Sequence, residues 1–292
     1  MNVAVVGSSG QLGKEVMKLS DNKYVTLIPF TRVDWDMSQL TSIDFVKKVI
    51  DLNCTMIINV AAYTDVKGAE RDESGAFLIN CEAVKILADT CKEHNIVLIH
   101  ISTDYVFDGA KETPYVETDI INPINIYGKT KACGEQVIQE RLDRYVIIRT
   151  SWLFSFQTNC FLRKIYTTLV DKGEANIIDD QIGSPTSIRS LAQFILRLIS
   201  QYHERHTLHW GVFHFANKPY VSWYQFSKYT MKRMKKKNVI SKNSNIFPCK
   251  SDQWDDGVTR PANSCLDTTK TTIKYHIEME NWKDEVDKIK FT

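Results

Sequence analysis

The sequence predicts an α/β fold in which helices cover both faces of a doubly wound parallel sheet, with a smaller lobe toward the C-terminus. Over the first 150 residues, short apolar runs alternate with helical patterns, as in parallel sheets with crossover helices. The first run, Val3 to Val6, leads directly into a glycine-rich turn and a helical pattern. The 292 residues suffice for one large domain and an additional lobe.

The strands of this sheet are predicted from short apolar runs rich in valine and isoleucine. They cover Val3 to Val6, Tyr24 to Ile28, Met56 to Val60, Ile96 to Ile101 and Tyr145 to Arg149. The helical patterns between them cover Leu12 to Leu19, Ile43 to Leu52, Phe77 to His94 and Ile124 to Glu140. Because helices join successive strands, the strands are expected to run parallel.

The helix expected over Ile124 to Glu140 has a start signal. Asn122 is a favourable N-cap residue, and Pro123 fits the first helical position because proline lacks the N–H group that is unpaired there. This helix carries Tyr127 and Lys131, which are considered below.

Beyond residue 150 the alternation loosens, which predicts the smaller lobe. Helices are expected near Cys160 to Lys172, over Ser187 to Gln201 and after Ser222, which forms a capping-box pattern with Gln225. Short strands are expected over Asn176 to Asp179 and Gly211 to Ala216. We therefore divide the chain into a first domain over residues 1–150 and a lobe over 151–292, some segments of which return to the sheet. The lobe would lie over the carboxyl edge of the sheet, where open α/β folds bind ligands.

Composition excludes several classes of protein. Apolar residues make up 43% and charged residues 25%, as in ordinary globular proteins. A net charge of +2 gives no reason to expect nucleic acid or a membrane surface as partner. The chain enters a strand without a basic leader, and no apolar run approaches the length of a membrane span. A cytoplasmic location is therefore expected.

Other groups of reactive or charged residues favour structural roles. The seven cysteines form no Cys-x-x-Cys pair and lie mostly in apolar periodic segments, so they are expected to be reduced core thiols. The lysine-rich run over residues 232–237 is typical of a solvated helix C-terminus, and a phosphate site is the less favoured interpretation. His203, His206 and His209 lack the pattern of a zinc site and are expected to face solvent. No metal is predicted.

The glycine-rich turn has the pattern Gly7-x-x-Gly10-x-x-Gly13. Alone this pattern is weak, but here it follows a strand and opens a helix, as a dinucleotide-binding fingerprint requires. Backbone N–H groups at the start of that helix would hold a pyrophosphate. The turn therefore predicts a dinucleotide cofactor.

Selectivity for the cofactor is expected to depend on the end of the second strand. Arg32 follows that strand where an NAD-selective enzyme usually carries a carboxylate for the ribose 2′-hydroxyl. A guanidinium at this place suits a 2′-phosphate, which favours NADPH. Asp34 and Asp36 follow closely, so NADH remains possible.

Tyr127 and Lys131 are four residues apart on the expected helix, so their side chains lie next to each other on one face. The phenol of Tyr127 is a candidate acid. A free phenol titrates near pH 10, and a nearby ammonium is expected to lower the pKa of Tyr127. Tyr-x-x-x-Lys is also a common chance string on helices. The glycine turn and the pair Ser102-Thr103, which ends an apolar run, raise its significance. Together they predict hydride transfer with a dinucleotide.

Several longer blocks of sequence, in the same order along most of the chain, resemble the dTDP-4-dehydrorhamnose reductases, which are extended short-chain dehydrogenases acting on nucleotide sugars. The blocks are Gly7–Gly13, Ala61–Thr64, Ser102–Gly109, Tyr127–Lys131, Arg149–Trp152, Asp180–Thr186 and Arg260–Ser264. The resemblance implies a Rossmann-like first domain that binds the dinucleotide and a lobe that binds the substrate.

By this resemblance Thr103, Tyr127 and Lys131 form the catalytic triad. Tyr127 would protonate the C4 oxygen of the sugar as hydride arrives from the nicotinamide, and Thr103 would hydrogen-bond the same oxygen. Lys131 would hold the nicotinamide ribose and lower the pKa of Tyr127.

The resemblance also assigns binding residues. The expected cofactor-binding residues are Gly7, Ser9, Gly10, Gln11, Leu12, Gly13, Arg32, Asp36, Met37, Ala61, Ala62, Tyr63, Asn80, Ser102, Tyr127 and Lys131. The expected substrate-binding residues are Thr64, Thr103, Tyr105, Trp152, Arg260 and Asn263, with the last two on the diphosphate. Packing in the lobe is the alternative role for Trp152.

Three functions follow from these residues. The leading one is the NADPH-dependent reduction of a 4-keto group on a nucleotide-linked 6-deoxy-hexulose, giving dTDP-L-rhamnose, in a possible homodimer. A second is a bifunctional 3,5-epimerase/4-reductase on a UDP-sugar, which needs an extra acid/base pair, commonly cysteine and lysine. No cysteine lies next to Ser102-Thr103 in the sequence. A third is a non-catalytic regulatory subunit like that of methionine adenosyltransferase.

Overall fold

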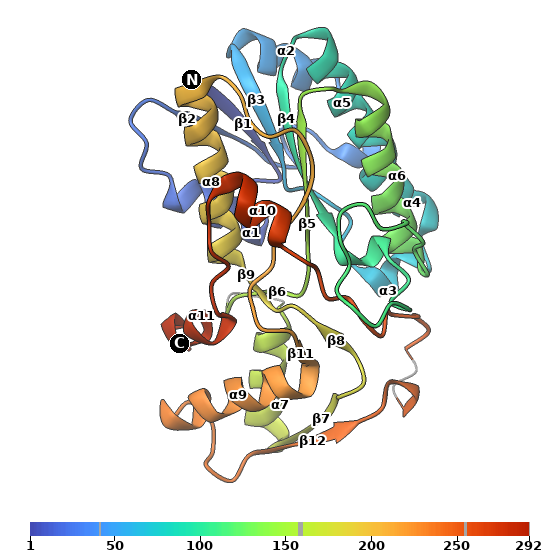
Figure 1. Cartoon of the computed structure of the whole chain (residues 1–292), viewed down its shortest axis with the longest axis vertical. Helices are drawn as coiled ribbons and strands as arrows, with labels where there is room; N and C mark the ends of the chain where they lie inside the picture. The colour runs from blue at the N-terminus through green and yellow to red at the C-terminus, as the bar shows by residue number, and fades with distance from the viewer. Residues whose placement is uncertain (41, 157–159, 254–255, 292) are drawn as a thin grey trace.

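The computed structural model describes residues 1–40, 42–156, 160–253 and 256–291. Its main feature is a six-stranded sheet in the order β10-β5-β4-β3-β1-β2, in which every neighbouring pair is parallel. The strands are β1 (Asn2–Val6), β2 (Thr26–Phe30), β3 (Cys54–Asn59), β4 (Val97–Thr103), β5 (Tyr145–Thr150) and β10 (Gly211–His214). The predicted doubly wound sheet is thus confirmed (Figure 1).

Helices cover both faces of this sheet (Figure 1). One face carries α1 (Gln11–Leu19) and α8 (Ile188–Arg205), and the other carries α2 (Ile43–Asp51), α5 (Ala83–Glu93) and α6 (Ile126–Arg141). Successive strand side chains point to opposite faces. Val3 accordingly packs in the α1 and α8 core, whereas Ala4 packs in the core beneath α2, α5 and α6.

Several predicted elements have different boundaries from those expected, beginning with the second strand and the helix that follows β3. The second strand is Thr26–Phe30 instead of Tyr24 to Ile28; Tyr24 is 75% exposed, and the parallel register with β1 pairs Val6 with Phe30. The helix expected over Phe77 to His94 is interrupted. It consists of α4 (Glu73–Phe77), a π-helical turn (Leu78–Glu82) and α5.

The start of α6 was predicted one turn too early. The helix begins at Ile126, and its N-cap is Asn125, whose side chain accepts the N–H of Gly128 at 2.8 Å. Asn122 lies in the preceding segment, where its side-chain amide donates to Asp108. Asn122 and Pro123 are residues that commonly start a helix, so the local sequence favoured a start there. In the folded chain the Asn122 side chain is bonded to Asp108 and does not cap the helix.

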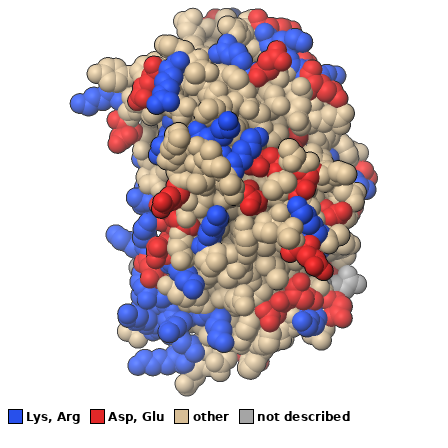
Figure 2. Space-filling view, viewed as in Figure 1, with Lys and Arg blue, Asp and Glu red and all other residues tan. Residues whose placement is uncertain are grey.

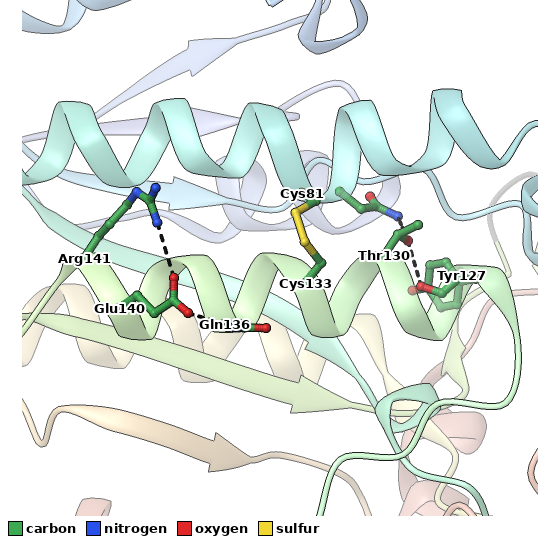
Figure 3. The surroundings of a disulfide bond; sticks show 8 residues. Cys81, Tyr127, Thr130, Cys133, Gln136, Glu140 and Arg141 are labelled. Carbon is green, nitrogen blue, oxygen red and sulfur yellow. Dashed lines mark hydrogen bonds and ion pairs between the residues drawn. A yellow bond between two sulfur atoms is a disulfide. The ribbon is translucent and has the colours of Figure 1, made fainter.

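The expectation of reduced thiols is wrong for two of the seven cysteines. Cys81 on the π-helical turn and Cys133 on α6 form a disulfide (Figure 3). Their helices lie side by side, and their Cα atoms are 5.4 Å apart, a normal separation for a disulfide. A separation of 52 residues hides this proximity from the sequence. Cys54, Cys91, Cys160, Cys249 and Cys265 are not bonded in disulfides.

The C-terminal lobe has its own core below the sheet (Figure 1). It contains α7 (Phe161–Lys172), α9 (Trp223–Lys236), α11 (Trp282–Lys288) and the parallel pair of β7 (Glu174–Ile178) with β12 (Asn245–Cys249). Buried side chains such as Phe226 and Trp282 join its helices. Two segments beyond residue 150 return to the main body, because β10 is the edge strand of the sheet and α8 packs on α1.

Several short elements complete the described fold. They are η1 (Met37–Gln39), α3 (Val66–Ala69), η3 (Asp104–Val106), β6 (Leu153–Phe154), β8 (Ile182–Gly183), β9 (Thr186–Ser187), β11 (Val221–Ser222), η4 (Ser251–Gln253) and α10 (Thr269–Tyr275). The strands expected over Asn176 to Asp179 and Gly211 to Ala216 are displaced or shortened to β7 and β10. The capping box of Ser222 and Gln225 is confirmed.

The lysine-rich run ends α9, as predicted, with Arg233, Lys235 and Lys236 in the last turn. In Figure 2 basic side chains gather over this end of the lobe. His206 and His209 are exposed, and His203 is half-buried against Tyr24. In the described parts of the chain, no helix is long and apolar enough to cross a membrane, and no three potential metal ligands cluster.

Candidate active site

A cleft of about 1120 Å³ opens at the carboxyl ends of the parallel strands, between the sheet and the lobe. Most residues predicted to bind cofactor or substrate line it. They are Gly7, Ser9, Gly10, Gln11, Leu12, Arg32, Asp36, Met37, Ala61, Ala62, Tyr63, Thr64, Ser102, Thr103, Tyr105, Tyr127, Lys131 and Trp152. Among the described residues, four predicted ones lie outside the lining: Gly13, Asn80, Arg260 and Asn263.

The glycine turn lies between β1 and α1, and its shape requires glycine at two positions. Gly7 has φ +85°, and a Cβ there would lie 2.7 Å from the Ala61 nitrogen. A Cβ on Gly13 would lie 2.3 Å from the Gly7 oxygen, so Gly13 allows the helix to pack on the turn without itself facing the cleft. Gly10 is the N-cap of α1 and provides no side-chain cap. The N-cap residue thus has no side chain over the start of α1, the place where a helix N-terminus holds an anion.

The end of β2 presents a cation to the cleft. The Arg32 side chain is 73% exposed, and its Nε lies 3.4 Å from Asp36 Oδ2. Asp34 is not available to a ribose, because it accepts hydrogen bonds from Thr31 and pairs with Lys48 at 2.7 Å. The Lys48 bond is the main reason why the pKa of Asp34 falls to about 2.

Asp36 shapes the same corner. Its carboxylate accepts hydrogen bonds from the backbone N–H and the hydroxyl of Ser38, so Asp36 caps η1. Met37, the first residue of η1, lines the cleft. These hydrogen bonds, ahead of the Arg32 charge, hold the pKa of Asp36 below its ordinary value. Asp36 is therefore an anion that is already partly neutralised by protein groups.

Asn80 lies behind the part of the cleft wall that follows β3. Its Oδ1 accepts the Tyr63 N–H at 2.8 Å, and its Nδ2 donates to the Tyr63 carbonyl at 3.1 Å and to Thr130 Oγ1 at 3.0 Å. Thr130 in turn donates to the Tyr127 carbonyl at 2.8 Å, as Figure 3 shows. Asn80 thus fixes the segment after β3 against the helix that carries Tyr127.

Tyr127 and Thr103 meet on the cleft wall. Burial raises the pKa of Tyr127 above its ordinary value, and a hydrogen bond with Thr103 opposes this shift. Thr103 also donates to the carboxylate of Asp104 at 2.8 Å. The ring of Tyr105 packs edge-on against Tyr127, with centroids 5.8 Å apart. The phenol therefore remains protonated through neutral pH, as an acid must.

The expected effect of Lys131 on Tyr127 is not what the structure shows. Lys131 is buried, and its Nζ lies 2.7 Å from the Ile101 oxygen and 3.1 Å from His100 Nε2. Its amine is thus bonded to β4, and the pKa of Tyr127 is raised instead of lowered. Burial lowers the pKa of Lys131 itself to about 8, against the opposing charge of Glu135.

A buried ion pair behind the site was not predicted. Glu135, one turn beyond Lys131 on α6, pairs with Arg149 of β5 at 2.7 Å, and both are almost fully buried. Glu135 also accepts the hydroxyl of Ser102. The i+4 spacing of Lys131 and Glu135 was a visible signal, but the identity of the partner strand was not. This pair fixes α6 on the sheet one turn beyond Lys131.

The far end of the cleft is aromatic. Trp152 follows β5 with φ +45° and stacks on Trp223 of α9, with centroids 3.5 Å apart. Phe161 of α7 packs against Trp223 at 4.2 Å. All three rings line the cleft. Trp152 therefore packs in the lobe and also lines the cleft, and its role in binding substrate stays a prediction.

Arg260 and Asn263 are engaged with protein groups. Two nitrogens of Arg260 bind Asp256 at 2.8 and 2.7 Å. Asn263 donates to the Lys111 oxygen at 2.6 Å and accepts the Cys265 N–H at 3.0 Å. In this arrangement both connect loops at the edge of the site, and their role in binding a diphosphate stays a prediction.

Sequence comparisons agree with this architecture. A family model described as "RmlD substrate binding domain" matches residues 1–290. A dTDP-4-dehydrorhamnose reductase of Aggregatibacter actinomycetemcomitans is 34% identical over 282 residues, which cover 96% of this chain and 95% of that protein. A dTDP-4-keto-6-deoxy-D-glucose reductase of Streptomyces niveus is 34% identical over 264 residues, covering 90% of this chain and 87% of that protein.

Solved structures show the same similarity. The dTDP-4-dehydrorhamnose reductase of Bacillus anthracis, in complex with NADP, is 28% identical with a TM-score of 0.89, covering 99% of this chain and 98% of that one. The UDP-glucose 4-epimerase of Brucella ovis is only 16% identical and shares the fold, with a TM-score of 0.79. On the match of the family model and the full-length similarity to its reductases, this chain belongs to the dTDP-4-dehydrorhamnose reductase family.

Proposed function

We propose that this protein is an NADPH-dependent reductase of the 4-keto group of a nucleotide-linked 6-deoxy-hexulose, converting dTDP-4-dehydro-β-L-rhamnose to dTDP-L-rhamnose. The observation that carries the proposal is the meeting of Thr103, Tyr127 and Lys131 in one cleft, whose other end is an uncapped glycine turn. A proton donor without a dinucleotide-binding turn would fit many other activities, and so would the turn without a proton donor.

Reduction of a ketone needs a hydride and a proton, and NADPH supplies the hydride when bound. Tyr127 donates the proton to the C4 oxygen as negative charge develops there. Burial raises the pKa of its phenol, so Tyr127 is protonated at neutral pH and has a proton to give. Thr103 holds the same oxygen through its hydroxyl, which requires that its hydrogen bond to Asp104 be exchanged for one to substrate.

The cofactor fits the residues at the other end of the cleft. Side chains at Gly7 or Gly13 would collide with the backbone, so the turn is shaped for close approach of a pyrophosphate to the start of α1. Arg32, exposed and only loosely paired at 3.4 Å, suits a 2′-phosphate. NADPH is therefore the proposed cofactor, and NADH is the weaker alternative.

In this proposal the aromatic end of the cleft receives the nucleotide sugar. Thr64 and Tyr105 would contact the sugar, and Trp152 would provide a flat apolar wall beside it. Arg260 would bind the diphosphate by exchanging the Asp256 carboxylate for phosphate oxygens, which have similar geometry. Asn263 would hold the loop that carries Arg260. A cytoplasmic location and a homodimer remain predictions.

A second substrate has specific support. The relative from Streptomyces niveus bears the name of a dTDP-4-keto-6-deoxy-D-glucose reductase, so the same reduction on the unepimerised sugar is a candidate. A bifunctional epimerase is a separate candidate because one cysteine, Cys160, lines the cleft from the start of α7. Its distance along the sequence from Ser102-Thr103 kept it out of the sequence prediction.

The test follows NADPH oxidation by absorbance. dTDP-4-dehydro-6-deoxy-D-glucose is produced in situ by the upstream dehydratase and offered with and without the 3,5-epimerase. Turnover only with the epimerase supports the rhamnose-forming reductase. Turnover without it, followed by identification of the product sugar, distinguishes the unepimerised substrate from bifunctional chemistry. NADPH binding without turnover in either reaction would overturn the proposal and favour another sugar nucleotide or a regulatory role.

A further inference from the structure

A row of three buried polar side chains runs from the end of β3 to α6. Asn59 and His100 are register partners on β3 and β4, and both are fully buried. Asn59 Nδ2 lies 3.0 Å from His100 Nδ1, and His100 Nε2 lies 3.1 Å from Lys131 Nζ. Buried polar atoms are normally hydrogen-bonded. The position of each proton in this row is therefore set by the neighbouring group.

The order of donors and acceptors begins at Ala61. Its backbone N–H donates to Asn59 Oδ1 at 3.1 Å, so the amide oxygen faces Ala61 and the NH₂ group faces His100. Because an amide NH₂ group only donates, Nδ1 of the ring must accept. Burial holds the pKa of His100 well below its ordinary value, so the ring is neutral. A neutral ring that accepts at Nδ1 carries its proton on Nε2.

The proton on Nε2 determines which form of Lys131 fits. A ring N–H pointing at Nζ needs a lone pair there, and only the neutral amine has one. The amine can still donate to the Ile101 carbonyl at 2.7 Å. An ammonium group would instead face the N–H of His100 with a second donor. The surroundings therefore favour the uncharged form, in the same direction as burial.

We propose that Asn59 and His100 are positioning residues that bias Lys131 toward the uncharged amine through the order of donors and acceptors in this row. This inference rests on the proposed reductase function, in which Lys131 serves the nicotinamide ribose. A lysine that titrates near neutrality can both hold and release the proton that Tyr127 must regain after each turnover.

The same row links the charge of Lys131 to the cofactor side of the cleft. If Lys131 is an ammonium, it can donate a hydrogen bond to Nε2 of His100 only when the His100 proton lies on Nδ1. The Asn59 amide must then rotate so that its oxygen accepts from Nδ1. That rotation replaces the bond to the Ala61 N–H by a contact between two donors. Ala61 lines the cleft beside the glycine turn. Protonation of Lys131 therefore weakens a bond that shapes the cofactor site.

Other charged and titratable groups around Lys131 act on it as well. On α6 they are Tyr127 and Glu135, and Glu135 is largely neutralised by Arg149 of β5. Asp104 of η3 faces Tyr127, and burial raises the pKa of Asp104 to about 7. A pH profile alone therefore does not identify Lys131, and the tautomer of His100 must be measured directly.

The direct test is ¹⁵N NMR of protein labelled at histidine, with the His100 signals assigned by their loss in His100→Gln. The expected result is a neutral His100 with its proton on Nε2 at pH 7. A proton on Nδ1, or a charged ring, would overturn the proposal. The tautomer is read on the wild-type protein, and the measurement requires no sugar; His100→Gln serves only to assign the signals.

The second test uses Asn59→Asp, in which a carboxylate can accept from Ala61 and from Nδ1 at once. His100 is then expected to carry its proton on Nδ1 and to accept from Lys131. The pH at which kcat/KM falls on the basic side should rise by about one unit or more. In Asn59→Asp/His100→Leu this rise should largely disappear; if it persists, the added charge acts through space and His100 is not the link.

Both parts of the argument can fail separately. NADPH binding can be followed by NADPH fluorescence as a function of pH, with no sugar present. The pH at which binding changes should be higher in Asn59→Asp than in wild type. If wild type binds NADPH but turns over no nucleotide sugar, the proposed function is wrong, while the His100 tautomer still decides the positioning role. An unchanged pH dependence in Asn59→Asp, with the Nδ1 tautomer established, would overturn that role.

Discussion

Residues that follow β1, β2 and β3 form the proposed cofactor end of the cleft, which consists of Gly7, Ser9–Leu12, Arg32, Trp35–Met37 and Ala61–Tyr63. The substrate end consists of Tyr105, Trp152, Phe161 and Trp223, which come from η3, the turn after β5, α7 and α9. The first end is held by backbone geometry at successive strand ends. The second depends on how a separate lobe packs onto the sheet. Binding determinants at the two ends should therefore respond differently to substitution.

The largest effect is expected between the two ends, at the acid. Tyr127→Phe should reduce kcat by about 10²–10⁴-fold, because the proton donor is lost while the ring remains in place. The dissociation constant of NADPH should change little, since the glycine turn is untouched. Tyr145→Phe, on β5 and outside the cleft lining, is the matched control. Retained turnover in Tyr127→Phe would show that another group protonates the sugar.

The next largest effect is expected on stability, from loss of the disulfide between Cys81 and Cys133. Cys81→Ser/Cys133→Ser should lower the free energy of unfolding by about 2–4 kcal/mol, because the bond constrains the unfolded chain. Thermal denaturation with and without a dithiol reductant measures this effect; the reductant should destabilise wild type toward the double variant and leave the double variant unchanged. Cys91→Ser, on α5, is the control for cysteine removal. Equal stability of oxidised and reduced wild type would contradict the prediction.

Selectivity of the cofactor end should depend on one exposed side chain. Arg32→Ala should weaken NADPH binding by about 10- to 100-fold, the range of a charge-assisted hydrogen bond. NADH binding should change much less, because NADH lacks the 2′-phosphate. Lys48→Ala removes a nearby cation that is paired with Asp34 and serves as the control. Equal losses for both cofactors would mean that Arg32 acts only through local structure.

Residues predicted from local motifs line the cleft more completely than those predicted near the C-terminus, Arg260 and Asn263. The glycine turn, Thr103, Tyr127 and Lys131 lie within local motifs whose spacing follows from strand and helix geometry. Asn59 and His100 were missed because each is a single polar residue in an apolar strand, and only strand register makes them neighbours.

The predictions that failed share a physical cause. The Cys81–Cys133 bond and the contacts of Lys131 with β4 depend on packing between elements far apart in the sequence. The same holds for the start of α6, where a tertiary contact of Asn122 displaced a locally favourable cap. The local sequence pattern predicted which elements form and which residues they carry. It did not predict the bonding partner of each side chain, because those partners come together only when the elements pack.

The smallest effect is expected at the substrate end and tests whether the lobe contributes to recognition. Trp223→Leu removes the ring on which Trp152 stacks but retains an apolar side chain at the start of α9. The loss of a stacked pair costs about 0.5–1.5 kcal/mol, so KM for the sugar nucleotide should rise roughly two- to tenfold. NADPH binding should be unchanged. Because Trp152 has φ +45°, its orientation depends on this partner as well as on its own backbone. If Trp223→Leu weakened NADPH binding as much as substrate binding, the two ends would be one cooperative unit and the division between them would fail.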